Sequence, residues 1–157
     1  MDRTSGSEPE DLRVRFPPGT LKIMKLQFSA GGIVIKGSKI LLCQHSQHHG
    51  WVFPKGLIGD HVDGEDKKET ALREVKEETG AEGKILRALT PVAFWFIFKK
   101  EKIKKTVNYF LMEYVGGDIA KHDQEMENVE WLDKDKIEER LTYKSDKKVW
   151  QEAKSFI

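Results

Sequence analysis

The chain has 157 residues, of which 38% are hydrophobic and 34% are charged, and its formal net charge is +1. This length fits one domain with a real core, and the small net charge excludes a global field that would draw the chain to nucleic acid or an anionic membrane. No apolar stretch approaches the roughly 20 residues of a membrane-spanning helix, so no membrane partner is expected. The single cysteine, Cys43, excludes an internal disulfide; its apolar surroundings predict a buried structural thiol in a reducing, cytoplasmic compartment.

The N-terminal segment differs in composition from the rest of the chain. Residues 1–23 are polar, contain Pro9, Pro17 and Pro18, and show little periodicity. We therefore expect a flexible tail followed by one folded domain over residues 24–157. The first residues have no apolar core, so no secretory signal is expected.

A β-hairpin is predicted at the start of the domain. Residues 25–36 are rich in β-forming side chains, and their Gly31-Gly32 pair marks a bend or a close backbone approach. A Gly-Ser turn leads to a second strand over residues 39–44. The polar loop 45–50 follows, and its histidine spacing fits no zinc pattern, so these side chains are expected to be solvated. They are His45, His48 and His49.

A helix is predicted from Glu65 to Thr79, where Gly80 ends it as a C-cap. Its apolar positions are sparse, so one narrow stripe should pack on a sheet. That stripe consists of Ala71, Leu72 and Val75.

The second half of the chain alternates between β-prone segments and turns. A long β-prone stretch covers residues 83–98, a basic hairpin connection covers 99–105, and strands are expected over 106–115 and 129–132. Two C-terminal helices should follow, capped by Asp133 and Ser145 and running to about Leu141 and Phe156. This order predicts a mixed α/β sandwich rather than regular βαβ repetition.

The most informative feature is a dense set of charges within the first helix. Glu74 and Glu78 are four residues apart and stack on one helix face, with Glu77 beside them. Like charges so placed repel each other, and a bound divalent cation would remove the repulsion. Such a cation would also create a catalytic site for phosphate chemistry.

The charges lie in a longer pattern of fixed spacing. It reads Gly59, five residues, Glu65, seven residues, Arg73-Glu74-Val75, one residue, Glu77-Glu78, one residue, Gly80-Ala81. This resembles the Nudix box, G-x5-E-x7-R-E-U-x-E-E-x-G-U, where U is a bulky aliphatic residue and Ala81 is a small substitute. A charged helix face alone is usually solvated, but the complete box is highly specific. The resemblance covers roughly residues 25–157. It implies an α/β/α sandwich with a mixed β-sheet and hydrolysis of a nucleoside diphosphate linked to another moiety.

The resemblance also implies roles for individual residues. Glu74, Glu77 and Glu78 would bind Mg²⁺ or Mn²⁺, and one of them or a later loop residue would take a proton from the attacking water. Arg73 would pair with Glu65 or Glu77 and orient the helix.

One departure from the family pattern precedes the box. Relatives commonly run Pro-Lys-Gly directly into it, whereas here Leu57-Ile58-Gly59 intervenes after Gly56. In the family a backbone carbonyl near this point helps to hold metal. Lys55, Gly56 and Ile58 are the three candidates to supply it.

Other segments resemble the diadenosine tetraphosphate hydrolases of this family. Residues 104–114 resemble their K-T-V-x-Y-F-L-x-E segment, which includes Tyr109, and Tyr143-Lys144 resembles a pair that lines their substrate cleft. Glu125 matches their loop glutamate and is a candidate additional metal ligand or base, with a solvated loop carboxylate as the alternative. The tyrosine that marks the group after the box is missing, and Phe98 lies near that position.

Side chains for the nucleotide itself follow from chemistry. Trp95 offers a ring on which a purine could stack, whereas Phe94 and Phe96 are expected in the core. A polyphosphate needs cationic donors, and the candidates lie on both sides of the box. They are Lys55, Lys104, Lys105 and Lys144.

We therefore expect a monomeric or homodimeric cytoplasmic hydrolase that cleaves diadenosine tetraphosphate into ATP and AMP with Mg²⁺ or Mn²⁺. Its partner would be a small nucleotide, and nucleic acid would enter only as an RNA 5′ end. Two alternatives remain: a pyrophosphohydrolase for modified nucleoside triphosphates or RNA 5′ ends, and a binding module without catalysis. The crowded carboxylates argue against the binding module.

Overall fold

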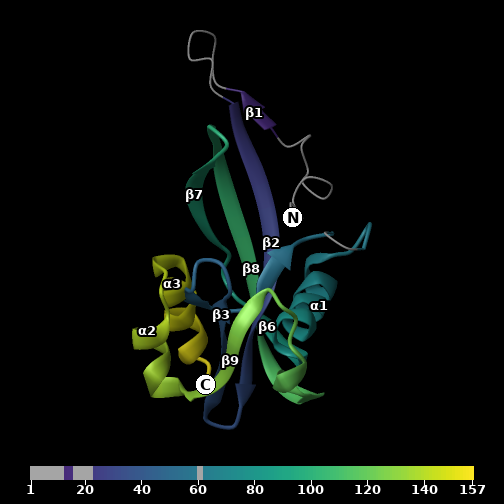
Figure 1. Cartoon of the computed structure of the whole chain (residues 1–157), viewed down its shortest axis with the longest axis vertical. Coiled ribbons are helices and arrows are strands. Elements are labelled where there is room, and N and C mark those ends of the chain that lie inside the picture. The colour runs from purple at the N-terminus through teal and green to yellow at the C-terminus, as the bar shows by residue number, and fades with distance from the viewer. Residues whose placement is uncertain (1–12, 16–22, 60–61) are drawn as a thin grey trace.

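The computed structural model describes residues 13–15, 23–59 and 62–157, and its elements surround one mixed sheet (Figure 1). Within these residues the sheet has nine strands. They are β1 (Arg13–Arg15), β2 (Ile23–Lys36), β3 (Lys39–His45), β4 (Trp51–Val52), β5 (Lys55–Leu57), β6 (Ala81–Ala88), β7 (Val92–Phe98), β8 (Glu101–Gly117) and β9 (Met126–Asp133). The helices are α1 (Lys67–Thr79), the 3-10 turns η1 (Ile119–Lys121) and η2 (Lys134–Lys136), α2 (Ile137–Arg140) and α3 (Lys144–Lys154).

The centre of the sheet is a long parallel pair. β2 and β8 run side by side from Met24 against Lys102 to Ile35 against Glu113. The other pairings along β2 and β3 are antiparallel, including the expected hairpin from β2 to β3. Gly31 allows the close approach that its sequence predicted, since a Cβ there would lie 2.1 Å from the carbonyl oxygen of Pro54.

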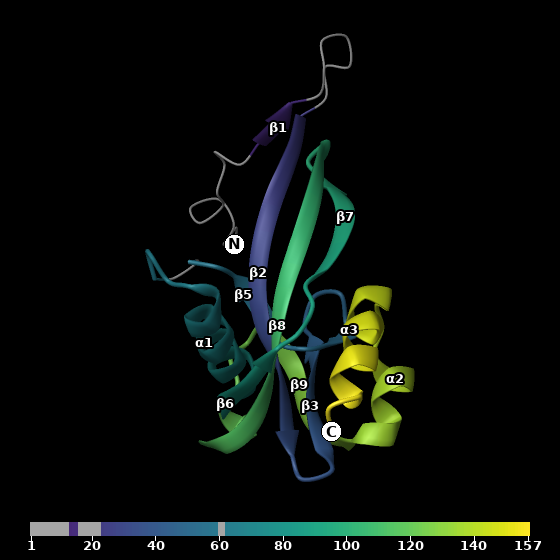
Figure 2. The ribbon, with the colours of Figure 1, turned by 180° about the vertical axis from the view of Figure 1, so that it is seen from behind.

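Helices cover both faces of this sheet, which confirms the expected α/β/α sandwich (Figures 1 and 2). On one side Ala71 and Val75 of α1 pack in one buried cluster with Phe110 and Met112 of β8. The other cluster contains the buried residues of α3, which lie with strand residues from β2, β3 and β8. These are Val149, Trp150 and Ala153. No helix among the described residues combines the length and apolar character needed to cross a membrane.

The structure describes one short strand within the segment expected to be a tail. Arg13–Arg15 forms β1, which pairs antiparallel with Ile23–Lys25 of β2. The rest of the expected tail, 1–12 and 16–22, lies outside the described residues.

The predicted strand over 83–98 is divided in two, and the basic connection after it is shorter than expected. Residues 89–91, which include Pro91, separate β6 from β7. Only Lys99 and Lys100 connect β7 to β8, and both have positive φ, 51° and 65°. A two-residue turn of this kind suits the right-handed twist of a hairpin, so the remaining lysines belong to β8. Together β7 and its β8 partner segment 101–107 form a hairpin, the β7–β8 ribbon, which extends with β2 beyond the helices (Figures 1 and 2).

The C-terminal helices are shorter than predicted. The Asp133 side chain forms no helix cap; it pairs with Lys39 at 3.0 Å, and the 3-10 turn η2 precedes α2. Helix α3 begins at Lys144 rather than after Ser145, and it ends at Lys154.

Candidate active site

Helix α1 carries the charges from Arg73 to Glu78, and its two ends are fixed by local signals. Asp66 is the N-cap, and Asp66 and Glu69 each accept a hydrogen bond from the other's backbone N–H in a capping box. Gly80 ends the helix in a left-handed conformation at φ 79°, as predicted. Because the cap lies at Asp66, the helix begins at Lys67 and not at Glu65. Glu65 therefore precedes the helix and its side chain reaches Thr70 and Arg73.

The Arg73 guanidinium joins the acidic residues of the box. Its Nε and second terminal nitrogen donate to both oxygens of Glu65 at 2.8 and 2.9 Å. The remaining terminal nitrogen donates to Glu74 at 3.1 Å and to Glu77 at 3.2 Å. Arg73 was expected to pair with Glu65 or Glu77, and it pairs with both. These bonds from Arg73 lower the pKa of Glu65 from its ordinary value of 4.5.

Glu78 is a buried acid of the box that lines the cavity described below. Its side chain is 1% exposed, and its Oε1 accepts a hydrogen bond from the backbone N–H of Lys55 at 3.2 Å. Its Oε2 has no hydrogen-bond partner among the described residues. Burial raises the pKa of Glu78, and the nearby charges of Glu125 and Glu74 add to that increase. A buried carboxylate of this kind is costly unless a cation or donor offsets it, so the residue fits a cation-binding role.

The backbone of β5 lies directly against these carboxylates. A Cβ at Gly56 would lie 2.1 Å from the carboxyl group of Glu74, so only glycine allows this approach. Leu57 pairs with Ser29 of β2, and the Ile58 N–H donates to the carbonyl of Phe28 at 3.0 Å. The three inserted residues thus begin by extending the β5 pairing. Of the three carbonyl candidates, Lys55 donates its N–H to Glu78 and Gly56 lies against the carboxyl group of Glu74. We refer to Glu74, Glu78 and Gly56 as the carboxylate floor.

The carboxylate oxygens of the box are the ligand type that a hard divalent cation prefers. The described side chains are not, however, already arranged around a common point. No group of three or more His, Cys, Asp or Glu side chains with metal-site geometry occurs among the described residues. Arg73 holds Glu74 and Glu77 through the bonds given above. A cation would therefore compete with Arg73 for these two glutamates. Mg²⁺ and Mn²⁺ prefer such oxygen ligands, and they often bind through only one or two carboxylates together with substrate phosphates.

A cavity of about 750 Å³ opens above Glu78. Expected site residues among its lining are Lys55, Lys105 and Glu125. The Glu125 carbonyl accepts hydrogen bonds from the N–H and hydroxyl of Ser46, both at 3.0 Å, which fixes the loop of Glu125 against the histidine loop. Lys55 and Lys105 supply positive charge within the same space. The cavity therefore joins carboxylates and ammonium groups, as a polyphosphate site requires.

Four predicted substrate contacts do not line the cavity: Trp95, Tyr109, Lys144 and Tyr143. Trp95 is 47% exposed and does not line the cavity; its ring lies near the Lys102 and Lys104 ammonium groups. Tyr109 is 1% exposed and its hydroxyl donates to Asp146 at 2.9 Å, which makes it a core residue. Lys144 begins α3 on an exposed surface outside the lining. Alternation along the strands explains the first two, because neighbouring residues point to opposite faces.

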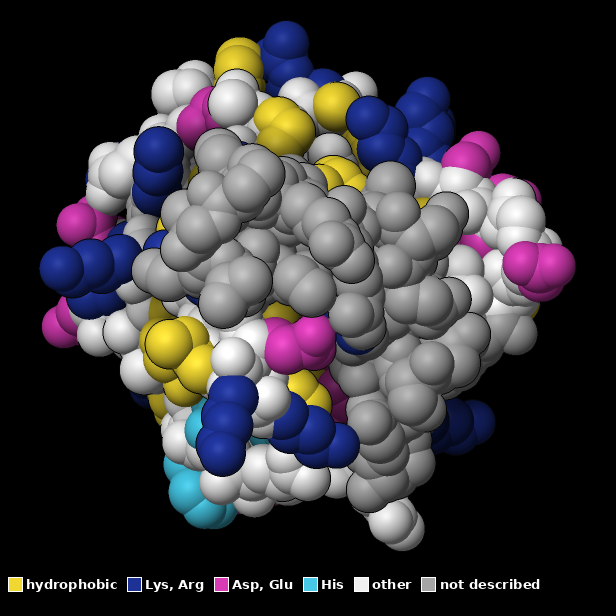
Figure 3. All heavy atoms as spheres, turned by 90° about the horizontal axis from the view of Figure 1, so that it is seen from above, with side chains coloured by type: hydrophobic (Ala, Val, Ile, Leu, Met, Phe, Trp, Pro, Cys, Tyr) yellow, Lys and Arg dark blue, Asp and Glu magenta, His cyan; other side chains and the backbone are white. Residues whose placement is uncertain are grey.

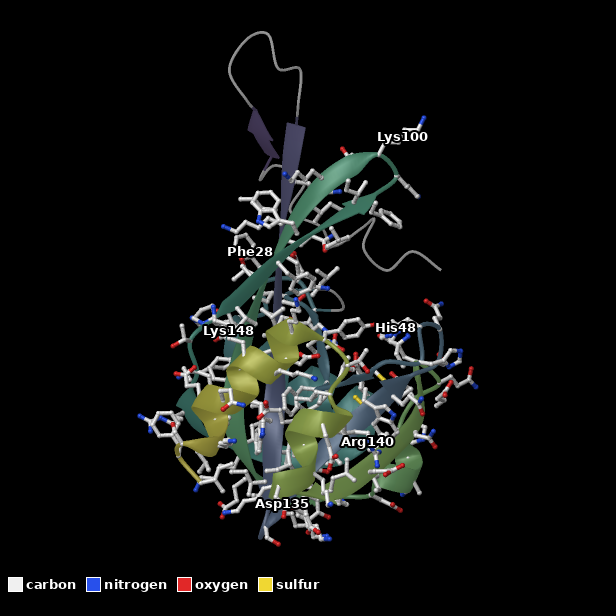
Figure 4. The ribbon with its side chains drawn as sticks, turned by 90° about the vertical axis from the view of Figure 1, so that its left-hand side faces the viewer. Phe28, His48, Lys100, Asp135, Arg140 and Lys148 are labelled. Carbon is white, nitrogen blue, oxygen red and sulfur yellow. The ribbon has the colours of Figure 1, made fainter. Side chains whose placement is uncertain are left out.

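Sequence reasoning missed several lining side chains. His48 is exposed, as expected, and His45 is partly buried. Both also line the cavity, with their rings stacked at 4.2 Å. The predicted Tyr143 lies behind His48 rather than in the lining, and its hydroxyl is 2.9 Å from His48 Nδ1 (His48 is labelled in Figure 4). Phe96 was expected in the core, but it lines the cavity together with Phe98. The position of the hairpin turn was the sequence signal that could have shown which residues face the cavity. With the turn at 99–100, Phe94 pairs with Lys105, so Phe96 shares the face of that lysine.

Together, the fold and the site define a class of enzyme that acts on nucleotide phosphates: an α/β/α sandwich in which a helix presents buried carboxylates to a cavity lined by lysines and rings. The NUDIX domain model matches residues 25–153. The chain belongs to the Nudix family, whose hydrolases act on pyrophosphate bonds of nucleotides and generally need a divalent metal.

Individual relatives agree with this assignment. The asymmetrical bis(5′-nucleosyl)-tetraphosphatase of Rattus norvegicus is 36% identical over 122 residues, which are 76% of this chain and 80% of that protein. The mutator protein MutT4 of Mycobacterium tuberculosis is 34% identical over 140 residues, which are 82% of this chain. The chain spans about half, 55%, of the MutT4 length. The C. elegans Ap4A hydrolase in a binary complex has a TM-score of 0.64 and 23% identity, covering 83% of this chain and 96% of its own. That last likeness concerns the fold alone.

Proposed function

We propose that this chain hydrolyses dinucleoside polyphosphates and cleaves diadenosine tetraphosphate into ATP and AMP in the cytoplasm. The observation that carries the proposal is the cavity itself, in which the buried Glu78 carboxylate lies together with two lysines and several aromatic rings. A volume of about 750 Å³ is in the upper part of the range of small-molecule sites. The name of the tetraphosphatase relative, at 36% identity, supports the same substrate class.

The phosphate part of the substrate would lie between the carboxylate floor and the lysines. A divalent cation held by Glu74, Glu77 and Glu78, with Glu125 as a further ligand or base, would supply charge neutralisation and an acidified water. Lys55 and Lys105 both face the cavity and would pair with phosphate oxygens. Glu78 and Glu125 also face it, so either of these two carboxylates is placed to accept the proton of the attacking water. Arg73 would act indirectly, by holding Glu74 and Glu77 in place.

The nucleoside parts would use the rings on the cavity walls. Phe96 and Phe98 come from the β7–β8 ribbon, and His48 comes from the loop after β3. His48 contacts Tyr143 edge-on, with ring centroids 5.5 Å apart. Purines stack on such faces without strict sequence or base selectivity. Tyr143 therefore remains a proposed substrate contact through His48, whereas Trp95 and Tyr109 do not.

A hydrolysis panel tests this proposal. With Mg²⁺ or Mn²⁺ present, kcat/KM should be highest for diadenosine tetraphosphate, and its products should be ATP and AMP rather than two ADP. The panel should also contain ADP-ribose, 8-oxo-dGTP and a 5′-triphosphorylated RNA. A clear preference for one of these three would replace the substrate assignment. Absence of turnover on every compound with either metal would overturn the enzymatic proposal.

A further inference from the structure

The outer face of the β7–β8 ribbon, turned away from the cavity, combines exposed apolar side chains with lysines. Trp95 is 47% exposed and Ile97 is 75% exposed. The strand register places Trp95 opposite Lys104 and Ile97 opposite Lys102. The ammonium groups of Lys102 and Lys104 lie 4.7 and 5.8 Å from the centroid of the Trp95 ring. An exposed indole therefore lies close to two cations on one face of the ribbon.

Positive charge is concentrated in this part of the chain. Residues 99–105 contain five lysines and one glutamate, whereas the whole chain has a net charge of only +1. The turn residues Lys99 and Lys100 are both exposed at the tip of the ribbon, where Figure 4 labels Lys100. Figure 3 views the molecule from this end, and lysine and arginine side chains lie there beside hydrophobic ones. The excess charge is local, so it can select a partner without making the whole chain basic.

We propose that this outer face binds single-stranded RNA. Proteins that bind single-stranded nucleic acid combine cationic side chains with exposed aromatic rings. Here the lysines would pair with phosphates, and a base would stack on the indole. A second copy of the chain is a poorer occupant, because pairing two ribbons would bring together two segments with the same excess of positive charge. A purely apolar peptide would supply no negative group to pair with Lys102 and Lys104.

The ribbon connects this surface to the cavity. Its other face supplies Phe96, Phe98, Ile103 and Lys105 to the cavity lining. A strand bound on the outer face would therefore cross the ribbon to place its 5′ end near the carboxylates. The inference goes beyond hydrolysis of dinucleoside polyphosphates and does not depend on it, because binding on the outer face needs no phosphoanhydride.

The test measures binding of an RNA that cannot be hydrolysed. A 12-nucleotide oligouridylate with a 5′ hydroxyl and a 3′ fluorophore is titrated with the intact protein by fluorescence anisotropy. At 50 mM salt we expect a Kd between about 1 and 100 μM. Trp95→Ala should weaken binding by about 10-fold and Trp95→Phe should restore most of it, since stacking tolerates a change of ring. In Lys102→Gln/Lys104→Gln the slope of log K against log salt should become shallower by about 1.4, because each phosphate contact of a single strand contributes about 0.7.

The matched control is Lys134→Gln/Lys136→Gln, which removes the same charge from the exposed turn η2. This turn lies at the opposite end of the molecule, where Figure 4 labels Asp135. The control should bind RNA within twofold of the wild type, and thermal unfolding should show that every variant folds. The proposal is overturned if the wild type shows no binding up to 1 mM, or if the ribbon and control variants bind equally. It is also overturned if the protein does not bind RNA but co-sediments with phosphatidylserine vesicles. Loss of a dimer in Trp95→Ala, without a change in RNA binding, would overturn it as well.

Discussion

The carboxylate floor and the β7–β8 ribbon carry opposite charges and are held in place by opposite means. Glu74 and Glu78 are almost completely buried, and a backbone strand, a guanidinium and the sheet constrain them. Lys102 and Trp95 lie on the β7–β8 ribbon and face solvent. A buried charge depends on every neighbour, whereas an exposed one is screened and replaceable. Substitutions in the floor should therefore affect catalysis strongly, and stability where they disturb the packing, whereas substitutions on the ribbon should affect only what binds there.

The largest effect is expected from Glu78→Gln. The change removes a charge from the floor but keeps its shape, and kcat/KM should fall at least about 100-fold, since even residues behind metal ligands account for 10–100-fold. The melting temperature should stay level or rise, because a costly buried charge is lost. The change in kcat/KM is measured with diadenosine tetraphosphate, and the change in melting temperature is measured by thermal unfolding. The control is Glu113→Gln on the exposed face of β8, which should behave as wild type. Near-normal turnover in Glu78→Gln would remove Glu78 from the site.

Gly56→Ala tests whether the floor depends on backbone contact. The new Cβ would lie 2.1 Å from the Glu74 carboxyl group, so either Glu74 or β5 must move. We expect a loss of about 1–3 kcal/mol of unfolding free energy, as in other overpacked interiors, together with reduced turnover. Denaturant unfolding and kinetics provide the measurements.

Gly116→Ala is the matched control for Gly56→Ala. A Cβ at Gly116 would come no closer than 4.0 Å to Glu82, and this glycine also lies in a strand. It should leave stability and turnover nearly unchanged. If both alanine variants behaved alike, the close approach of Gly56 to Glu74 would have no special role.

Tyr109→Phe separates a core role from a substrate contact. The hydroxyl donates to Asp146, a carboxylate that is 3% exposed and whose pKa is raised chiefly by burial. Removing this donor should cost about 1–3 kcal/mol of unfolding free energy while KM changes less than threefold. Tyr114→Phe is the control, since its hydroxyl donates to the exposed Gly117 carbonyl and should matter little. A large rise in KM with unchanged stability in Tyr109→Phe would return this residue to the substrate site.

The smallest effect is a pH dependence from Glu65. Hydrogen bonds from Arg73 lower the pKa of Glu65 below its ordinary value of 4.5, so folding favours the ionised form. The resulting stability is present above that value and is lost as the pH falls through the lower pKa of the folded state. Glu65→Gln should therefore be less stable than wild type at pH 7, and the difference should shrink in acid. Urea unfolding at several pH values measures it. A difference that grew in acid would contradict the assigned cause.

The sequence predicted most elements and the box because both depend on local signals. The hairpin from β2 to β3, the Gly80 cap and the pairing of Arg73 with Glu65 all follow from short-range patterns. The C-terminal helices were predicted less well. Asp133 and Ser145 had the right residue types for caps, but Asp133 pairs with Lys39, which is distant in sequence. A cap competes with any other partner that the tertiary structure supplies.

By itself, the sequence determined the fold class and the Nudix family, because the box fixes residue types at helix spacing. Only the tertiary structure decided which face each side chain of the second half occupies. A strand turns alternate residues to opposite faces, so the position of one turn at Lys99-Lys100 decides that Phe96 lines the cavity and Trp95 does not. Packing of α3 against the sheet likewise made Tyr109 of β8 a core residue. The acidic helix could be predicted from local spacing, whereas the walls of its cavity depended on long-range strand register.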